Sequence, residues 1–209
     1  EWHYASVPSN YPGFSGFGPT SSTWWFYDTF EQEDVRKTNL IAEYVGVDGI
    51  LYNRENPGQT LIRGPRPIKM DLDDGRPGGS STVDWILYRY ADVLLSKAEG
   101  IANSLGAPNE EAIELINVIR RRAGLKDVKL SDYSTLPLFN DMLLTERSHE
   151  FWAENGQYRA DLIRHDKFVS RSREVTGSIY TDKTKELLPF SNARISEGKG
   201  KFLQNPGYN

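Results

Sequence analysis

The stretch Trp85–Leu105, WILYRYADVLLSKAEGIANSL, predicts the fold class of this chain. Its apolar residues recur every three or four positions, which is the spacing of one face of a helix. The residues on this face are Leu87, Ala91, Leu94, Ala98, Ile101 and Leu105. Gly106 and Pro108 follow directly and end the pattern. We therefore expect an amphipathic helix with a wide apolar face over residues 85–105.

Further helices are predicted on the C-terminal side of this stretch. Asn109 is typical of a helix N-cap, and Glu110 and Glu111 suit the positive end of the helix dipole. The inner face of this second helix is predicted to contain Ile113, Ile116, Ile119 and Ala123. Residues 136–154 and 158–165 predict a third and a fourth helix. Two consecutive helix pairs joined by short turns indicate an all-α fold of tetratricopeptide-like helix pairs, accompanied by a large irregular loop region.

Pro and Gly residues interrupt the sequence on both sides of the helices, which suggests three segments of one partial domain. These are a loop-rich aromatic segment (1–83), the two helix pairs (84–168) and an irregular C-terminal tail (169–209). Within the first segment, Thr23 is a candidate N-cap for a short helix over residues 24–30. Residues 49–53 and 60–63 could pair as a small hairpin.

Composition excludes several classes of protein. The 209 residues contain no cysteine, which excludes disulfides, Cys-ligated zinc and lipid attachment through cysteine within this chain. The formal net charge is -4, and the longest basic run is Arg120–Arg122, so nucleic-acid binding is not expected. This run ends a predicted helix, where it complements the dipole and is expected to face solvent. No apolar stretch approaches the ~20 residues of a membrane helix, and Glu1–Tyr4 shows no signal-peptide pattern.

Three carboxylates on the third helix allow two interpretations. Glu146, Glu150 and Glu154 share one helix face at intervals of four residues. A glycosidase needs two carboxylates about 5–9.5 Å apart in a cleft, and this spacing meets that distance only loosely. We favour a structural ion-pair network that ties the third helix to the fourth, because three arginines lie nearby in the sequence. They are Arg147, Arg159 and Arg164.

Neither a metal site nor a cofactor site is predicted. Asp71, Asp73 and Asp74 precede Gly75, but their spacing does not fit a calcium-binding EF-hand loop, so a polar turn is the better interpretation. The histidines, which are His3, His149 and His165, are too scattered for a metal triad. No phosphate-binding, dinucleotide-binding or nucleophile-elbow motif is present.

Aromatic residues are concentrated near the N-terminus, where ten of the 25 fall within the first 30 positions. Aromatic rings stack on the C–H faces of sugars and cost little entropy to immobilise. The candidate ligand-binding residues are Trp2, Tyr4, Tyr11, Trp24 and Trp25. In the short helix, Phe26, Tyr27 and Phe30 are expected to supply the buried face and to leave the two tryptophans partly outward. The alternative is that these rings close a small core over the helices.

Motifs in one order along the chain resemble the SusD/RagB family. They are Phe30-Glu31-x-x-Asp34-x-Arg36, Arg89–Leu95 followed by Ala98-Glu99, Ile116–Leu125, Glu146–Arg164, Leu188-Pro189 and Gln204–Tyr208. The resemblance covers residues 30–209 and is to the C-terminal half of the family, whose members are more than twice as long. The missing N-terminal half would then be a partner of this chain.

The resemblance implies a function that composition alone does not. Members of this family are surface-exposed lipoproteins of the Gram-negative outer membrane that take part in glycan utilisation. They cover a TonB-dependent transporter of the SusC type and capture oligosaccharides or, in the RagB-like branch, oligopeptides. They bind nutrients without catalysing a reaction. We therefore expect a carbohydrate-binding component of a nutrient importer. An oligopeptide-binding component is an alternative, and so is a half that only docks onto the transporter.

Overall fold

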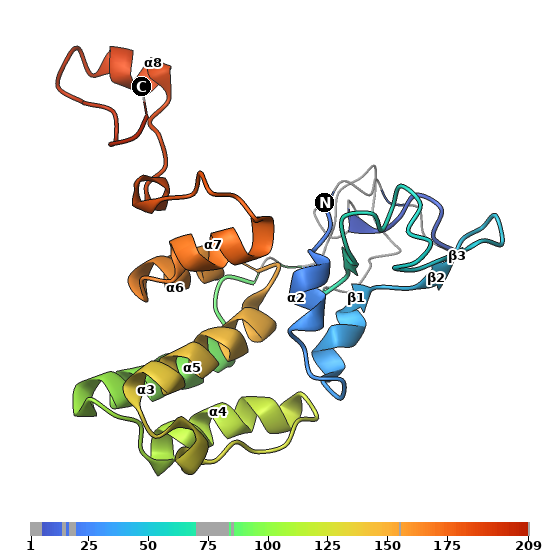
Figure 1. Ribbon diagram of the computed structural model, residues 1–209, viewed down its shortest axis with the longest axis horizontal. Coiled ribbons are helices and arrows are strands. Elements are labelled where there is room, and N and C mark those ends of the chain that lie inside the picture. Colours follow the sequence, from blue (N-terminus) through green and yellow to red (C-terminus); the bar gives the residue numbers. More distant parts are fainter. Residues whose placement is uncertain are drawn as a thin grey trace. The chain divides into compact units, whose positions relative to one another are not determined.

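The computed structural model describes residues 6–13, 16, 20–69, 84, 86–154 and 156–208. It divides into two compact units, residues 1–156 and 157–209. The boundary at Gly156 lies between the predicted third helix and the predicted fourth helix. The structure is mainly helical (Figure 1), which confirms the expectation of an all-α fold.

The predicted first helix pair is present as α3 (Tyr90–Leu105) and α4 (Glu110–Arg122). Asn109 caps α4 by accepting a hydrogen bond from the backbone N–H of Ala112, as predicted. Helix α3 begins five residues later than expected, because the backbone of Arg89 is extended (φ −129°, ψ 160°). From this position the Arg89 side chain donates hydrogen bonds to Glu150 and Glu154. Leu87 therefore lies outside the helix and is exposed, contrary to the expected inner face.

The third helix, α5, covers Leu136–Phe151 and carries Pro137 in its first turn. It ends three residues before the expected position, because Trp152 is extended and Ala153 has a positive φ of 59°. The turn between α4 and α5 is fixed by Asn117, whose side chain accepts from the backbone N–H of Val128 and donates to its carbonyl. A short 3-10 helix, η2 (Leu130–Tyr133), follows this turn.

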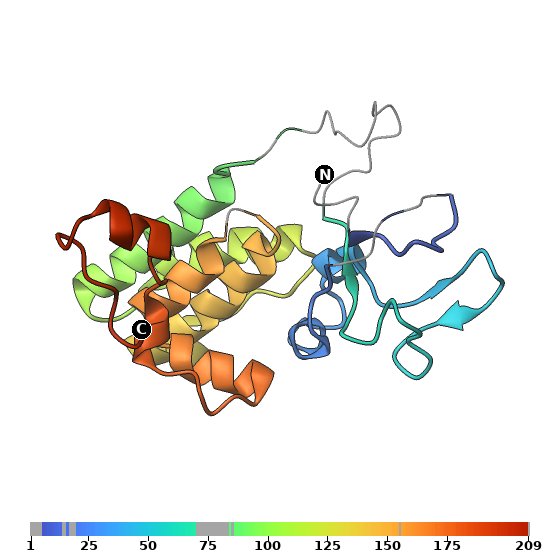
Figure 2. The ribbon, with the colours of Figure 1, turned by 90° about the horizontal axis from the view of Figure 1, so that it is seen from above.

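These three helices lie side by side (Figure 2) and enclose the main hydrophobic core of the first unit. Its buried members are Ala91, Leu94, Leu95, Ala98, Ala102, Ala112, Ile113, Ile116, Ile119, Phe139, Leu143 and Phe151. Six of these twelve lie at the positions predicted for the inner faces of the first two helices: Ala91, Leu94, Ala98, Ile113, Ile116 and Ile119. Leu105, also predicted on the inner face, is instead 62% exposed, because it is the last residue of α3. No described helix is long and apolar enough to cross a membrane.

The N-terminal part of the first unit contains short elements. They are α2 (Trp24–Asp28), η1 (Val35–Asn39), β1 (Leu40–Ile41), β2 (Tyr44–Val45), β3 (Leu51–Tyr52) and β4 (Arg66–Pro67). Thr23 caps α2, as predicted, by accepting from the backbone N–H of Phe26. The predicted hairpin is wrong in its partner: β3 pairs with β2, and residues 60–63 form a turn. Gly49, at a positive φ of 75°, allows the tight β2–β3 turn.

The remaining strands form an antiparallel pair, β1 with β4, in which Leu40 lies opposite Pro67. A glycine is required just before this pair. Gly64 has φ +142°, and a Cβ atom there would lie 2.2 Å from the carbonyl oxygen of Ser22. The backbone just before β4 and the backbone just before α2 therefore lie in close contact.

The second unit contains α6 (Gln157–Arg164), α7 (Phe168–Thr176), η3 (Lys183–Glu186) and α8 (Asn192–Glu197). Helices α7 and α8 lie mostly or wholly in the segment expected to be irregular, where no sustained apolar periodicity marks them. The C-terminal residues are held by side chains rather than by strand pairing. Gln204 bonds to both the N–H and the carbonyl of Phe190, and Asn205 donates to the carbonyl of Leu188.

The core of the helix pair provides a first stability prediction. Leu95→Ala should lower the free energy of unfolding by about 2–5 kcal/mol, because Leu95 is fully buried between the helices. Leu105→Ala, a matched control on the same helix at a site that is 62% exposed, should cost less than about 1 kcal/mol. Urea denaturation monitored by circular dichroism measures both. Equal losses for the two variants would contradict the described core.

Candidate functional site

A groove of about 410 Å³ opens in the N-terminal part of the first unit. Helix α2, η1, β1 and the residue after β4 contribute to its walls. It is lined by Tyr11, Tyr27, Gln32, Asp34, Lys37, Thr38, Leu40, Ile41, Ala42, Glu43 and Ile68. The lining combines two phenol rings and aliphatic side chains with amide, hydroxyl, ammonium and carboxylate groups. Such a mixture suits a solute that has both apolar faces and polar edges.

Tyr27 is the aromatic residue most closely integrated into this groove. The Nζ atom of Lys37 lies 4.3 Å from the centre of the Tyr27 ring, over its face. Burial raises the pKa of the Tyr27 phenol, and the nearby carboxylates Asp28 and Glu43 raise it further. The phenol therefore keeps its proton at neutral pH and remains a hydrogen-bond donor.

The predicted ligand-binding residues occupy different places. Tyr11 lines the groove and is half-buried, with its ring 5.4 Å from that of Tyr44. Trp24 and Trp25 are half-buried on α2 and do not line it. Trp2 and Tyr4 lie outside the described residues. Of the three candidates among the described residues, Tyr11 therefore lines the groove.

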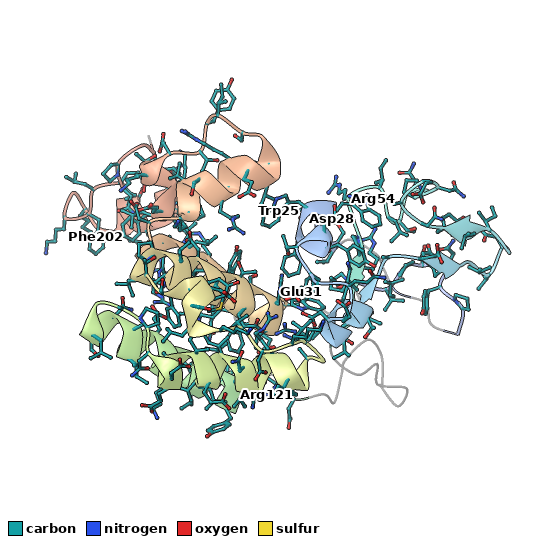
Figure 3. The ribbon with its side chains drawn as sticks, turned by 60° about the horizontal axis from the view of Figure 1, so that its bottom comes forward. Trp25, Asp28, Glu31, Arg54, Arg121 and Phe202 are labelled. Carbon is teal, nitrogen blue, oxygen red and sulfur yellow. The ribbon has the colours of Figure 1, made fainter. Side chains whose placement is uncertain are left out.

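Trp24 lies beside the groove and contacts its wall. Its ring meets Tyr27 edge to face at 5.8 Å, and the guanidinium of Arg54 lies 4.8 Å from its centre. Arg54 in turn forms an ion pair with Asp28 at 2.7 Å (Figure 3). One face of the indole is thus covered by Arg54.

Tyr27 was expected on the buried face of the short helix together with Phe26 and Phe30. The prediction is correct for Phe26 and Phe30, whose rings lie 5.0 Å apart in a cluster with Trp152. Tyr27 packs partly against this cluster but also lines the groove. The helical spacing of three residues from Trp24 could have shown that the two rings share a side of α2.

A cluster of charged side chains, most of them buried but with Arg122 half exposed, lies next to the groove, and we call it the charge cluster. Its members are Asp34, Arg36, Lys69, Arg89, Arg120, Arg122, Glu146, Glu150 and Glu154. Glu150 is shared most widely. Its Oε1 accepts from Arg89 at 2.5 Å and from Arg122, while its Oε2 accepts from Arg36 at 3.1 Å. Its side chain is only 2% exposed.

Each of the other two glutamates pairs with two cationic side chains. Glu146 accepts from Arg36 at 2.7 Å and from Arg120 at 3.4 Å. Glu154 pairs with Arg89 at 2.8 Å and with Lys69. Lys69 also donates to the carbonyls of Glu150 and Trp152 and so caps the C-terminus of α5.

The partners of these glutamates differ from those predicted. An ion-pair network does surround them, and the pairs described within the first unit join α5 to η1, to α4 and to the residue before α3. Arg147 pairs with Asp92 on α3 at 3.0 Å, Arg159 donates to the carbonyls of residues 185 and 186, and Arg164 pairs with Asp161. The true partners are distant in the sequence, so no local spacing could have indicated them.

The basic run Arg120–Arg122 at the end of α4 was expected to face solvent, and this is only partly correct. Arg120 is buried and pairs with Glu31 at 2.8 Å as well as with Glu146. Arg122 reaches Glu150. Arg121 does face solvent, where it pairs with Glu114 and Asp127 (Figure 3).

The glutamates of the charge cluster are held in ion pairs and lie outside the groove. Burial raises the pKa of Glu146, although Arg36 acts against this shift. Burial also opposes ionisation of Glu150, but hydrogen bonds from Arg122 and Arg89 outweigh it and lower the pKa. None of the three glutamates lines the groove. Within the described part of the chain, no group of three or more His, Asp or Glu residues could hold a metal ion.

His149 lies beside the charge cluster and is held as a neutral ring. It stacks on Phe30 with ring centres 4.0 Å apart, and its Nε2 lies 2.9 Å from Thr29 Oγ1. The Thr29 hydroxyl donates its proton to the carbonyl of Phe26, so it accepts from His149 and assigns the proton to Nε2. Burial lowers the pKa of His149 to about 4, and the nearby charge of Arg36 contributes.

Comparison with known proteins identifies the family. The SusD family model matches residues 20–208. The chain belongs to the SusD family. This confirms the resemblance found in the sequence motifs. SusD-like protein P38 of Formosa agariphila is 41% identical over 103 residues, which is 45% of this chain and 18% of that protein.

Solved structures share the fold of this SusD-family chain. A SusD superfamily protein from Parabacteroides distasonis superposes with a TM-score of 0.73 at 22% identity, covering 98% of this chain and 45% of that one. Surface glycan-binding protein A from Bacteroides thetaiotaomicron gives a TM-score of 0.65 at 24% identity, covering 98% of this chain and 46% of that one. The chain thus spans less than half the length of these relatives.

The neutral histidine predicts a pH dependence of stability. Below pH 6.5 the unfolded chain protonates His149, whereas the folded chain does so only near pH 4. The free energy of unfolding should therefore fall by about 3 kcal/mol through His149 as the pH falls from about 7 to 4. The free energy of unfolding of His149→Gln should fall by correspondingly less over this pH range. Urea titrations at each pH measure it for both proteins. Parallel pH profiles for the two proteins would show that His149 is not held neutral.

Proposed function

We propose that this chain is a non-catalytic ligand-binding component of a nutrient import system at the surface of the outer membrane, and that it captures oligosaccharides. Membership of the SusD family supports a role in surface binding of nutrients. Two of its structural relatives, from Bacteroides thetaiotaomicron and Bacteroides uniformis, are named surface glycan-binding protein A. A TonB-dependent transporter of the SusC type is the proposed partner.

The observation that carries the proposal is the groove that Tyr11 and Tyr27 line. A sugar ring has C–H faces that stack on aromatic rings and hydroxyls that both donate and accept hydrogen bonds. Gln32, Thr38 and Glu43 line the same groove and offer matching polar groups. Its volume of about 410 Å³ lies within the range of small-molecule sites.

We propose Tyr11 and Tyr27 as the central stacking residues. Trp24 extends the aromatic surface beside the groove, with one ring face covered by Arg54. Trp25, Trp2 and Tyr4 remain candidates for further contacts, proposed from the sequence. Binding would use stacking and hydrogen bonds alone, since the buried glutamates are already bonded to arginines and a lysine.

An oligopeptide is the second candidate ligand. Lys37 and Glu43 place an ammonium and a carboxylate in the same groove. These charges could pair with the two termini or with the charged side chains of a short peptide.

Titration calorimetry tests the proposal with a panel of maltoheptaose, laminarihexaose, xylohexaose, mannohexaose, chitohexaose, hexagalacturonate and tetraalanine. For an oligosaccharide that binds, Tyr27→Ala and Tyr11→Ala should each weaken affinity about threefold to tenfold. This corresponds to the roughly 0.5–1.5 kcal/mol of a stacked ring. Tyr180→Ala, at an 82% exposed site in the second unit, is the matched control and should bind like the parent chain.

The remaining outcomes discriminate between the alternatives. Binding of tetraalanine alone would favour the oligopeptide function. Binding of a sugar that neither groove variant weakens would move the site away from Tyr11 and Tyr27. No binding by a folded chain to any member of the panel would favour a half that only docks onto the transporter.

A further inference from the structure

One wall of the groove is formed by η1, a 3-10 helix of five residues. Asp34, Lys37 and Thr38, from this helix and its N-cap, line the groove. A helix this short has few internal hydrogen bonds, and 3-10 geometry makes them weaker than those of an α-helix. The position of this wall therefore depends on contacts to the rest of the unit.

Arg36 makes the most extensive of these contacts, although it does not line the groove. Its Nε and Nη2 donate to Asp34 at 2.9 and 2.7 Å. Its Nη1 donates to Glu146 at 2.7 Å and to Glu150 at 3.1 Å. The planar guanidinium thus joins the N-cap of η1 on one edge to α5 on another. The Arg36 side chain is 11% exposed, so solvent screens these bonds little.

The partner side of this contact is rigidly held. Glu150 is bound from the other direction by Arg89 and Arg122, and Glu146 is bound by Arg120. Helix α5 belongs to the main core. Besides these side-chain bonds of Arg36, one backbone hydrogen bond among the described residues ties η1 to the helices. It runs from the N–H of Val35 to the carbonyl of Ala123 at 3.0 Å.

We infer that Arg36 is a positioning residue that fixes the η1 wall on α5 and thereby sets the affinity of the groove without touching its ligand. The binding part of this inference rests on the proposed function. The fork geometry of arginine is essential to it, because a lysine ammonium at position 36 cannot hold Asp34 and two glutamates in one plane. A buried support of this kind keeps contact groups within the narrow tolerance that recognition requires.

The test compares Asp34→Asn/Arg36→Met with Asp34→Asn alone, because Asp34 itself lines the groove, and with a matched control, Glu114→Gln/Arg121→Met, which removes an exposed acid–arginine pair elsewhere. The Asp34 substitution avoids leaving an uncompensated buried carboxylate. Hydrogen exchange needs no ligand. We expect exchange over residues 35–41 to accelerate at least tenfold in the first variant, with the β2–β3 hairpin and α3 unchanged. The control should behave like the parent chain.

Affinity is measured on the same proteins with each oligosaccharide of the panel that binds the parent chain. We expect the Asp34/Arg36 variant to bind at least tenfold more weakly than Asp34→Asn alone, and the control to bind like the parent chain. If no oligosaccharide binds the parent chain, the proposed function fails, and the exchange result still decides whether Arg36 fixes the wall. Accelerated exchange with unchanged affinity would overturn the positioning role.

A conservative variant covers the case in which the double variant does not fold. Arg36→Lys keeps the charge and should retain the melting temperature within a few degrees. It should still accelerate exchange over residues 35–41 and weaken binding. Exchange and affinity equal to those of the parent chain in Arg36→Lys would overturn the inference, because charge alone would then suffice.

Discussion

The first unit depends on the carboxylate of Glu150, which is withdrawn from water and accepts hydrogen bonds from Arg36, Arg89 and Arg122. A buried carboxylate without such partners would be strongly destabilising. With them, one side chain ties α5 to the helix pair on one side and to η1 on the other. The late start of α3 follows from this arrangement, since Arg89 serves Glu150 and Glu154 from an extended backbone.

The same arrangement separates support from recognition. Glu146 and Glu150 of α5 form ion pairs inside the unit, whereas Lys37, Glu43 and Gln32 line the groove. Asp34 belongs to both, because it lines the groove and binds Arg36. This division suits a protein that binds without chemistry, as proposed for this member of the SusD family. The aromatic residues divide likewise: Phe26 and Phe30 pack with Trp152, while Tyr11 and Tyr27 line the groove.

Much of the helical part could be predicted because the signals are local. The buried positions of α3 and α4, the caps at Thr23 and Asn109 and the family motifs all follow from residues close together in the chain. Predictions failed where a distant residue decided the outcome. Two such cases are β3, which pairs with β2, and Arg120, which pairs with Glu31 instead of facing solvent. Helix α7 was missed because its sequence shows no apolar periodicity, and none of its residues is buried.

The sequence by itself determined the all-α class, the positions of the main helices and the membership of the family, because periodicity, capping and motif order are properties of neighbouring residues. Only the tertiary structure decided which charges pair and where a groove opens. Arg36 and Glu146 are 110 positions apart, and Arg89 and Glu150 are 61 apart. Pairing over such separations depends on how packed helices bring side chains together. The groove depends on the same packing, since its walls are short elements that take their places only against the core.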